Sequence, residues 1–325
     1  MKVAKLTLLS ITLAQAIWAA PTAGVALRHD LGLKVSLPRR SSSVTARTVS
    51  RSPAADRMPS PVSFRVKQDR GLLADVWVNG AGPYTFAIDT GAGATILSNR
   101  LAAAVGIAIN SNRGISVSGL SGRQQANEHE GSIKTLALGH EENLLPAHHA
   151  VIVSGGLPPD IDGILDPTEA YSPFGYVIDI PNHEIGAFDC ALHPLSTRNP
   201  PPEGAVVHWL TRGGTRRPFV SLDDGRWALL DTGSAFGLAV TQRSGTDERR
   251  EGVNARDIGG GSISSRRVEP STVSIGALTL RRVPTDVLSG VEKGAPTLLG
   301  RDALYPFRMA FDPLHKLIAI GPAGH

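Results

Sequence analysis

An internal repeat constrains the fold of this chain more than any other feature of its sequence. The segment AIDTGAGATILS (87–98) has a counterpart, LLDTGSAFGLAVT (229–241), and in each an apolar run ends at Asp-Thr-Gly. Similar elements follow both copies in the same order and end in SPFGYVIDIPNHEIGAF (172–188) and YPFRMAFDPLHKLIAI (305–320). Self-similarity of this kind indicates two copies of one structural unit.

The elements within each unit are predicted to be strands. In the segment 62–89, Asn79-Gly80 is a strong hairpin-turn signal, and Val76, Val78 and Phe86 alternate as residues of a half-buried sheet do. Low aromatic content (5%) with 35 Gly and 23 Pro suits many short strands joined by tight turns. The prediction is an all-β fold made of two similar lobes.

The ends of the chain and the region between the repeats have a different composition. Lys2 and Lys5 precede an apolar stretch, and Ala14-Gln15-Ala16 has the pattern of a signal-peptidase site. The predicted parts are a signal peptide (1–16, with cleavage as late as 20), a basic Ser/Arg/Pro-rich linker or pro-segment (17–60), a first lobe (61–190), a Pro-rich linker (191–204) and a second lobe (205–325).

The net charge of +4 is unevenly distributed. Residues 1–60 hold nine Lys and Arg and two Asp, which gives +7, and the rest of the chain carries −3. Because the body has no basic excess, the sequence argues against nucleic-acid binding. The apolar stretch before residue 20 is too short for a comfortable membrane span. Cys190 is the single cysteine, so it can form no intramolecular disulfide, and we expect neither a metal nor a cofactor.

The two Asp-Thr-Gly copies point to acid–base chemistry. An ionised Asp at the end of an apolar strand is costly unless it is well bonded or shares a proton. A pseudo-twofold arrangement would bring Asp89 and Asp231 together, and two adjacent carboxyls hold one proton between them. One could then activate a water as general base while the other protonates a carbonyl oxygen. Asp89 and Asp231 are therefore the predicted catalytic pair.

The neighbouring residues are predicted to support that pair. The glycines let backbone N–H groups approach the carboxylates, and the threonine hydroxyls can bond backbone across the lobe interface. A Ser234 hydroxyl bonded to Asp231, where the first copy has Ala92, would leave the charge on Asp231 and the proton on Asp89. The supporting residues are Thr90, Gly91, Ala92, Thr232, Gly233 and Ser234.

These motifs resemble those of aspartic proteases. The segments VNGAGPYTFAIDTGAGATILS and LLGRDALYPFRMAFDP are similar to the bacterial retropepsin-like form, and the tandem arrangement resembles the bilobal pepsin plan. The resemblance covers nearly all of 62–322. In the first lobe, Asp166 stands where the family has Gly.

The resemblance implies the acid-protease fold, with two pseudo-twofold-related β-barrel lobes, an active-site cleft between them and a β-hairpin flap over it. The Gly/Ser-rich segment after each motif is the flap candidate. The residues concerned are Ser118, Gly119, Gly122, Gly259 and Gly260.

The predicted function is that of an exported aspartic endopeptidase, periplasmic or secreted, which acts as a monomer on polypeptides in an extended conformation. No stable membrane span is expected after signal cleavage. One alternative is a catalytically weak or inactive peptide-binding protein on the same fold. Another is a cell-envelope interaction protein that uses the basic tail.

Overall fold

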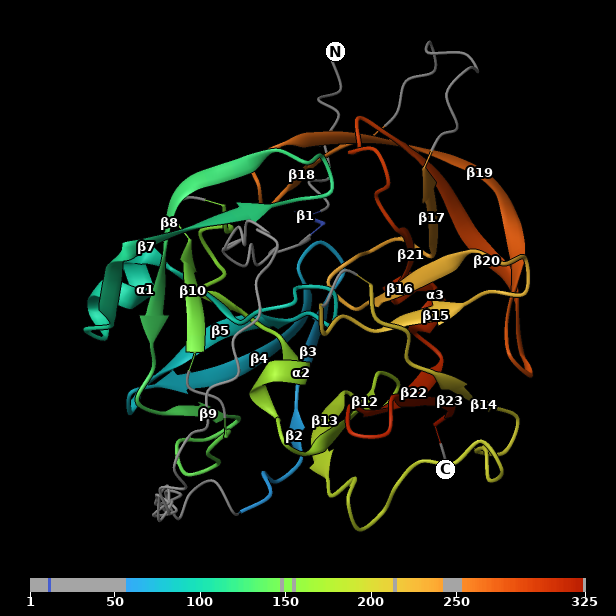
Figure 1. Ribbon diagram of the computed structural model, residues 1–325, viewed down its shortest axis with the longest axis horizontal. Coiled ribbons are helices and arrows are strands. Elements are labelled where there is room, and N and C mark those ends of the chain that lie inside the picture. The colour runs from blue at the N-terminus through green and yellow to red at the C-terminus, as the bar shows by residue number, and fades with distance from the viewer. Residues whose placement is uncertain are drawn as a thin grey trace, which may run out of the picture.

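A computed structural model of the chain describes residues 11–12, 57–146, 149–153, 156–212, 215–241 and 253–323. Their regular structure is almost entirely β-strand, arranged in three sheets (Figure 1). The prediction of an all-β acid-protease fold is confirmed. The predicted signal peptide and the basic segment lie outside the described residues, apart from 11–12 and 57–60. The described helices are α1 (Asn99–Ala104), α2 (Pro167–Ala170) and α3 (Arg301–Leu304).

The first lobe is built on a nine-stranded sheet. Its strand order is β3-β4-β5-β11-β6-β10-β8-β7, and β9 pairs with β4. Asn79 and Gly80 both have positive φ and join β4 to β5, as the sequence predicted. Ser98 accepts a hydrogen bond from the Leu101 N–H and thereby caps α1. The strands are β3 (Arg65–Lys67), β4 (Gly71–Val78), β5 (Ala81–Ile88), β6 (Ile96–Ser98), β7 (Ala108–Ser118), β8 (Gln124–Ser132), β9 (Leu136–Leu138), β10 (His149–Val153) and β11 (Gly163–Leu165).

The second lobe is built on an eight-stranded sheet that repeats the central pattern of the first. Here β16 runs parallel to β21, as β5 runs parallel to β11 in the first lobe. A short helix follows each of these parallel neighbours, α2 after β11 and α3 after β21. The strand order is β1-β18-β19-β20-β17-β21-β16-β15. The strands are β1 (Ile11–Thr12), β15 (Phe219–Ser221), β16 (Trp227–Asp231), β17 (Leu238–Thr241), β18 (Val253–Asp257), β19 (Ser262–Ile275), β20 (Leu278–Ser289) and β21 (Thr297–Gly300).

A third sheet joins the lobes along the lower edge of the molecule in Figure 1. Both halves of the chain contribute three strands, and β12 pairs antiparallel with β22, so that Val177 lies opposite Ala310. Tyr176 and Phe311 stack across this junction with ring centroids 4.6 Å apart. The strand order is β14-β23-β22-β12-β13-β2. The strands are β2 (Val62–Ser63), β12 (Gly175–Asp179), β13 (Glu184–Phe188), β14 (Ala205–His208), β22 (Phe307–Asp312) and β23 (Leu317–Pro322).

One apolar core continues from the first lobe through the shared sheet into the second. It contains the alternating residues of the first hairpin, such as Val76 and Phe86, together with Leu230 beside the second motif. Burial of this continuous apolar surface is the dominant favourable term that holds the two lobes together.

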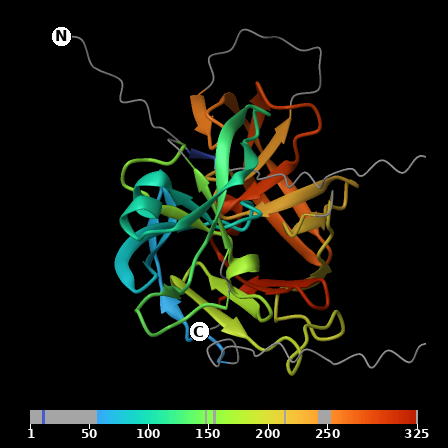
Figure 2. The same ribbon diagram turned by 60° about the vertical axis from the view of Figure 1, so that its left-hand side comes forward.

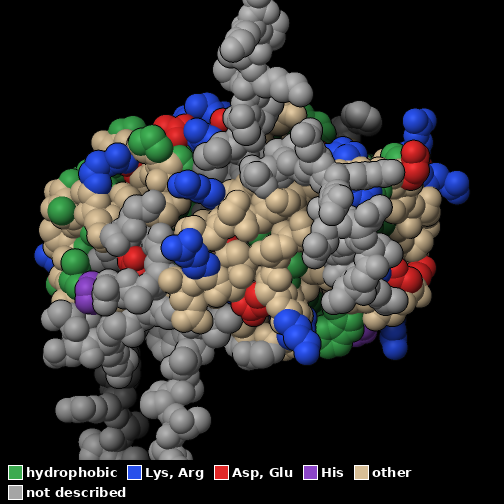
Figure 3. Space-filling view, turned by 90° about the horizontal axis from the view of Figure 1, so that it is seen from above, with side chains coloured by type: hydrophobic (Ala, Val, Ile, Leu, Met, Phe, Trp, Pro, Cys, Tyr) green, Lys and Arg blue, Asp and Glu red, His purple; other side chains and the backbone are tan. Residues whose placement is uncertain are grey.

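One face of the molecule carries side chains of both charges. On the face shown in Figure 3, Lys and Arg side chains are spaced over the surface, with Asp and Glu side chains between them. Within the described part of the chain, no helix is long and apolar enough to cross a membrane.

Candidate active site

The two motif aspartates lie at equivalent places in the two sheets. Asp89 follows the last residue of β5, and its N–H donates to the Leu165 carbonyl of the parallel neighbour β11 at 3.0 Å. Asp231 ends β16, and the parallel register with β21 places it beside Gly300. Both side chains are fully buried. The sheets therefore hold two carboxyls at the ends of rigid apolar strands.

Reciprocal threonine hydrogen bonds tie one motif to the other. The Thr90 hydroxyl donates to the Leu230 carbonyl at 2.6 Å, and the Thr232 hydroxyl donates to the Ile88 carbonyl at 3.0 Å. Each hydroxyl also accepts the other threonine's backbone N–H at 3.1 Å. This is the cross-lobe bonding that the sequence predicted for Thr90 and Thr232, and it fixes the two turns relative to each other.

The motif glycines show how closely the two turns approach. A Cβ at Gly91 would lie 2.8 Å from Asp231 Cγ, and a Cβ at Gly233 would lie 2.4 Å from Asp89 Cγ. No side chain fits at either distance, so each glycine lets its turn pack directly against the other lobe's carboxyl. The structure thus brings Asp89 and Asp231 together as one site.

Asp89 is the carboxyl that favours the proton. Burial raises its pKa well above the ordinary range, and the neighbouring Asp231 raises the pKa further. A hydrogen bond of 2.8 Å from the Gly91 N–H to Oδ1 acts in the opposite direction and is outweighed. The carboxyl of Asp166 adds a further charge that raises the pKa of Asp89.

Asp231 is the carboxyl that favours the charge. Burial raises its pKa to about 6, and contacts that stabilise the ionised form limit this rise. They are the bond to Asp89, the Ser234 N–H at 3.0 Å from Oδ1, the positive charge of Arg301 and the Gly233 N–H. Because the pair is coupled, the two groups share one proton that resides mainly on Asp89.

The cause of this asymmetry differs from the one predicted from the sequence. The Ser234 group that donates to Asp231 is its backbone N–H, whereas its hydroxyl accepts a hydrogen bond from the Phe236 N–H at 3.3 Å. The expectation that the Ser234 hydroxyl contacts the carboxylate was therefore wrong. The difference between Ala92 and Ser234 is not what places the proton on Asp89, since neither side chain is a donor to a motif carboxylate.

Arg301 is a functional residue that the sequence reasoning missed. Its side chain is buried, and Nη1 donates to the Thr232 and Gly233 carbonyls at 3.1 and 3.3 Å. Nη2 donates to the Gln68 carbonyl of the first lobe at 2.8 Å. A charged residue directly after the apolar run Leu298-Leu299-Gly300 was the available signal, because such a side chain is buried only where it has partners.

The flap candidates of the two lobes meet above the site. Ser118, Gly119 and Gly122 lie at the turn between β7 and β8, and Gly259 and Gly260 lie at the turn between β18 and β19. The Ser121 N–H donates to Asp257 Oδ2 at 2.7 Å, which links the two tips. Figures 1 and 2 show both hairpins running to the same end of the molecule, where their tips touch.

Each hairpin tip places an apolar side chain in the other lobe. Leu120 is buried in a cluster of second-lobe residues that includes Phe219, Leu229 and Phe236. Ile258 is buried in a cluster of first-lobe residues that includes Ala92, next to the first motif. Both clusters include residues next to the motif aspartates, so the two hairpin tips pack over the region of the pair.

Asp166 has a local structural role at its unexpected position. Its side chain accepts the Thr168 N–H at 2.9 Å and caps the N-terminus of α2, while its own N–H donates to Thr95 Oγ1. The equivalent position in the second lobe cannot hold a side chain, because a Cβ at Gly300 would lie 2.4 Å from the Phe236 carbonyl. Burial raises the pKa of Asp166 to about 7, and the charge of Glu169 adds to the increase.

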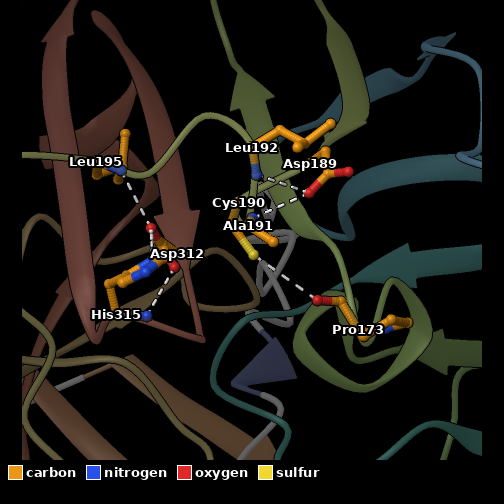
Figure 4. A network of polar contacts seen from close by, with 8 residues as sticks. All are labelled: Pro173, Asp189, Cys190, Ala191, Leu192, Leu195, Asp312 and His315. Atoms are coloured by element: carbon orange, nitrogen blue, oxygen red, sulfur yellow. Dashed lines mark hydrogen bonds and ion pairs between the residues drawn. The ribbon is translucent and has the colours of Figure 1, made fainter.

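A second polar cluster, around Cys190, lies at the junction of the lobes (Figure 4). The Cys190 thiol points to the Pro173 carbonyl, at 3.7 Å, and burial raises the pKa of that thiol. His315 Nδ1 lies 2.8 Å from Asp312 Oδ2, which also accepts the Leu195 N–H. The thiol is thus bonded to backbone, and the imidazole to a carboxylate that anchors the inter-lobe linker, so the cluster has a structural role.

The comparison with known families agrees with this geometry. Residues 74–161 match the family described as "gag-polyprotein putative aspartyl protease". The matched segment contains the first motif, its supporting residues and the first flap hairpin. No curated protein matches the chain by sequence.

Proposed function

We propose that the whole chain is an endopeptidase whose site is completed by the second lobe, because residues 74–161 match a putative aspartyl protease family. The observation that carries this proposal is the pairing of Asp89 with Asp231, two buried carboxyls that differ in proton affinity. Reciprocal threonine bonds and Arg301 hold the pair in place.

The pair supplies a base and an acid at the same time. The ionised Asp231 would take a proton from a water molecule, whose oxygen then attacks the carbonyl carbon of the scissile peptide bond. The protonated Asp89 would donate its proton to the carbonyl oxygen, which gives a gem-diol. Asp231 would then pass the proton taken from water to the amide nitrogen, and Asp89 would take back a proton from a gem-diol hydroxyl. The C–N bond breaks to give a carboxylic acid and an amine. Oδ2 of each aspartate is buried and has no hydrogen-bond partner among the described residues, so both oxygens are available to the water and the substrate.

The test is digestion of casein and of a peptide library at acidic to neutral pH. The wild-type protein should cleave internal peptide bonds, and pepstatin should inhibit the cleavage. Asp89→Asn and Asp231→Asn should each lower the turnover by roughly 10³-fold or more, because one carboxyl cannot act as acid and base together. Near-normal turnover in either folded variant would contradict the proposal.

The site is also proposed to be complete in one chain. Asp89 and Asp231 lie in the same polypeptide, so specific activity should stay constant on dilution. A steep loss of activity on dilution would indicate a site that depends on a second chain.

The main alternative remains a peptide-binding protein without catalysis. It would bind extended peptides, leave them intact, and show the same binding in both Asp→Asn variants.

Export to the periplasm or beyond is proposed from the leader sequence alone. The start of the first lobe is fixed at Ser60, whose N–H donates to Asn143 Oδ1 at 2.8 Å and whose carbonyl accepts from Asn143 Nδ2. A chain that begins at Arg57 keeps this clamp and should fold and cleave peptides. N-terminal sequencing of the protein recovered from a bacterial periplasm would locate the processing site, and a retained Met1 would contradict the proposal of export.

A further inference from the structure

Arg217 is a buried cation beside the paired aspartates, and two of its guanidinium nitrogens have no hydrogen-bond partner among the described residues. Its side chain is only 6% exposed, yet Nε and Nη1 are buried and make no hydrogen bond to any described residue. The nearest aromatic contact places its Cζ 5.8 Å from the centre of the Phe219 ring. An unpaired buried charge is costly, so a guanidinium retained in this state needs a physical explanation.

The strand register places Arg217 on the same side of the sheet as Asp231. Phe219 lies opposite Leu229 in the antiparallel ladder of β15 and β16, and the Leu230 N–H donates to the Pro218 carbonyl at 2.9 Å. Continuing this register sets Arg217 opposite Asp231. Residues opposite each other in an antiparallel pair point to the same face, so the guanidinium and the carboxyl share one side.

That side is the one covered by the flap of the first lobe. Phe219 and Leu229, which share the face with Arg217, form the cluster in which Leu120 of the flap tip is buried. Burial lowers the pKa of Arg217, and the charges of Asp231 and Asp89 limit that decrease. Arg217 therefore lies close enough to the aspartates to interact with their charges, on the side of the sheet that the first flap covers.

In the first lobe, the position opposite Asp89 holds a glycine in place of an arginine. There the same register, with Leu72 opposite Ile88, sets Gly71 opposite Asp89. A Cβ at Gly71 would lie 3.2 Å from Nη1 of Arg301, so that guanidinium occupies the space, and it donates to three backbone carbonyls. Arg301 therefore uses its donors in hydrogen bonds to the backbone. At the equivalent place beside Asp231, Arg217 has donors without a partner among the described residues.

The neighbouring arginines also differ from Arg217. Arg216 pairs with Glu169 at 2.9 Å, and Arg212 Nη1 donates to the Gly294 carbonyl at 3.3 Å. The missing partner is consequently specific to Arg217 and does not extend to the other arginines of this segment.

We propose that Arg217 binds a carboxylate of the substrate and makes the enzyme prefer polypeptides that carry an acidic group in the subsite beside Asp231. This inference rests on the proposed protease function. A planar guanidinium with unused donors matches a carboxylate, which can accept two parallel hydrogen bonds. The carboxylate can belong to an Asp or Glu side chain or to the substrate's C-terminus.

The test is a positional scan of peptides. A cleavable apolar peptide with an amidated C-terminus is prepared with Glu, Gln or Lys at each position flanking the scissile bond. A fourth series carries Gln and ends in a free carboxylate at successive distances from that bond. At one position, kcat/KM for the wild-type protein should be roughly tenfold to a hundredfold higher with a carboxylate than with Gln, the range given by a hydrogen bond to a charged group. A side-chain preference appears in the Glu series, and a C-terminal preference appears in the free-carboxylate series.

Arg217 variants then attribute the preference to this residue. Arg217→Gln should remove the difference between Glu and Gln peptides, mainly through KM for the Glu peptide. Arg217→Glu should reverse the preference so that the Lys peptide becomes the better substrate, a gain that a purely structural role would not produce. Arg212→Gln removes an exposed charge from the same segment and should leave the Glu preference intact.

Two results would overturn the proposal while leaving the protease function in place. One is equal kcat/KM for Glu and Gln peptides at every position in the wild-type protein, while cleavage itself proceeds; the protease function would then stand and the role of Arg217 would not. The other is an Arg217→Gln variant that slows all peptides by the same factor, which would mean that Arg217 acts only on the aspartates. Failure of the wild-type protein to cleave any peptide would refute the protease function together with this inference.

Discussion

Asp89 and Asp231 end the same kind of apolar strand and are bonded by the same kind of turn, yet their surroundings differ. The first receives the Gly91 N–H and faces a third carboxyl, Asp166. The second receives the Ser234 N–H and faces the positive charge of Arg301. A duplicated motif therefore has two different electrostatic environments, and residues outside the motif decide which copy keeps the proton.

The same comparison explains why the two turns cannot be treated as interchangeable. In the second lobe, tight packing at Gly300 excludes any side chain, and the next residue, Arg301, lies beneath the turn. In the first lobe, the equivalent position accommodates Asp166, which caps α2 and whose carboxyl raises the pKa of Asp89. A base and an acid can thus arise from one repeated sequence, because Asp166 follows β11 in the first lobe whereas Arg301 follows β21 in the second.

Of the changes proposed here, loss of Arg301 should alter stability and the difference in pKa between Asp89 and Asp231 the most. Arg301→Met removes three hydrogen bonds to backbone carbonyls and should lower the free energy of unfolding by about 3–5 kcal/mol. The loss of its charge should raise the pKa of Asp231 above about 6, so the acidic limb of the kcat/KM profile should move to higher pH. Chemical denaturation and a pH–rate profile measure the two effects.

Arg301→Lys is the matched control, since it keeps the charge and loses the forked geometry. It should keep most of the pH profile while losing stability. An Arg301→Met profile identical to that of the wild type would show that this charge does not distinguish the two aspartates.

Replacement of Asp166 should change how stability depends on pH. The folded pKa of about 7 lies above the unfolded value of 3.8, so this carboxyl favours folding below pH 4, and its favourable contribution disappears as pH rises through 7. Asp166→Asn keeps an acceptor for the Thr168 N–H and cannot ionise. It should stabilise the protein at pH 8 by at most about 4 kcal/mol, with little change near pH 4.

Thermal unfolding at pH 4, 6 and 8 provides the measurement. Asp160→Asn is the control, because that exposed carboxylate pairs with Arg70 at the surface. A gain in Tm for Asp166→Asn that does not change between pH 4 and pH 8 would contradict a buried ionisable group at this position.

The hydrogen bonds of Thr90 and Thr232 should contribute nearly equally to stability, whereas the electrostatic surroundings of the two aspartates differ. Thr90→Val and Thr232→Val each remove a hydroxyl that donates to a buried carbonyl and accepts a backbone N–H. Each change should lower the free energy of unfolding by about 1–3 kcal/mol. Thr→Ser at either position restores the hydroxyl and should recover most of the loss. If one Val variant were neutral and the other were not, the reciprocal geometry would be refuted.

The Ser234 hydroxyl should have the smallest effect. It accepts from the Phe236 N–H, while the bond to Asp231 comes from the backbone. Ser234→Ala should therefore leave the pH–rate profile of kcat/KM in place, and so should Ala92→Ser if the hydroxyl turns toward backbone. A clear shift of the Ser234→Ala profile would restore the original prediction that this hydroxyl sets the charge on Asp231.

Local patterns in the sequence predicted much of this architecture. The hairpin at Asn79-Gly80, the cap at Ser98 and the cross-lobe role of Thr90 and Thr232 all follow from residue types whose geometry is strongly restricted. The pairing of Asp89 with Asp231 followed from the repeat, because equivalent positions meet at a pseudo-twofold axis.

Other features depend on contacts between residues far apart in the sequence. Arg301 bonds to Gln68 and to the Thr232 turn, and no local pattern specifies that approach. The direction of the Ser234 hydroxyl depends on where the Phe236 N–H lies. The reciprocal exchange of Leu120 and Ile258 between lobes depends on the meeting of two hairpin tips. Tertiary packing determines these three features, and neither composition nor motif spacing predicts them.

The two motif carboxyls form one coupled pair with the proton on Asp89 and the charge on Asp231. The most direct measurement is NMR titration of the protein carrying ¹³C at the Asp side-chain carboxyl carbon, with resonances assigned from Asp89→Asn and Asp231→Asn. We expect the Asp231 resonance to move near pH 6 while the Asp89 resonance keeps its protonated position to higher pH. Two independent titrations near the ordinary value of 3.8, or ionisation of Asp89 before Asp231, would contradict it.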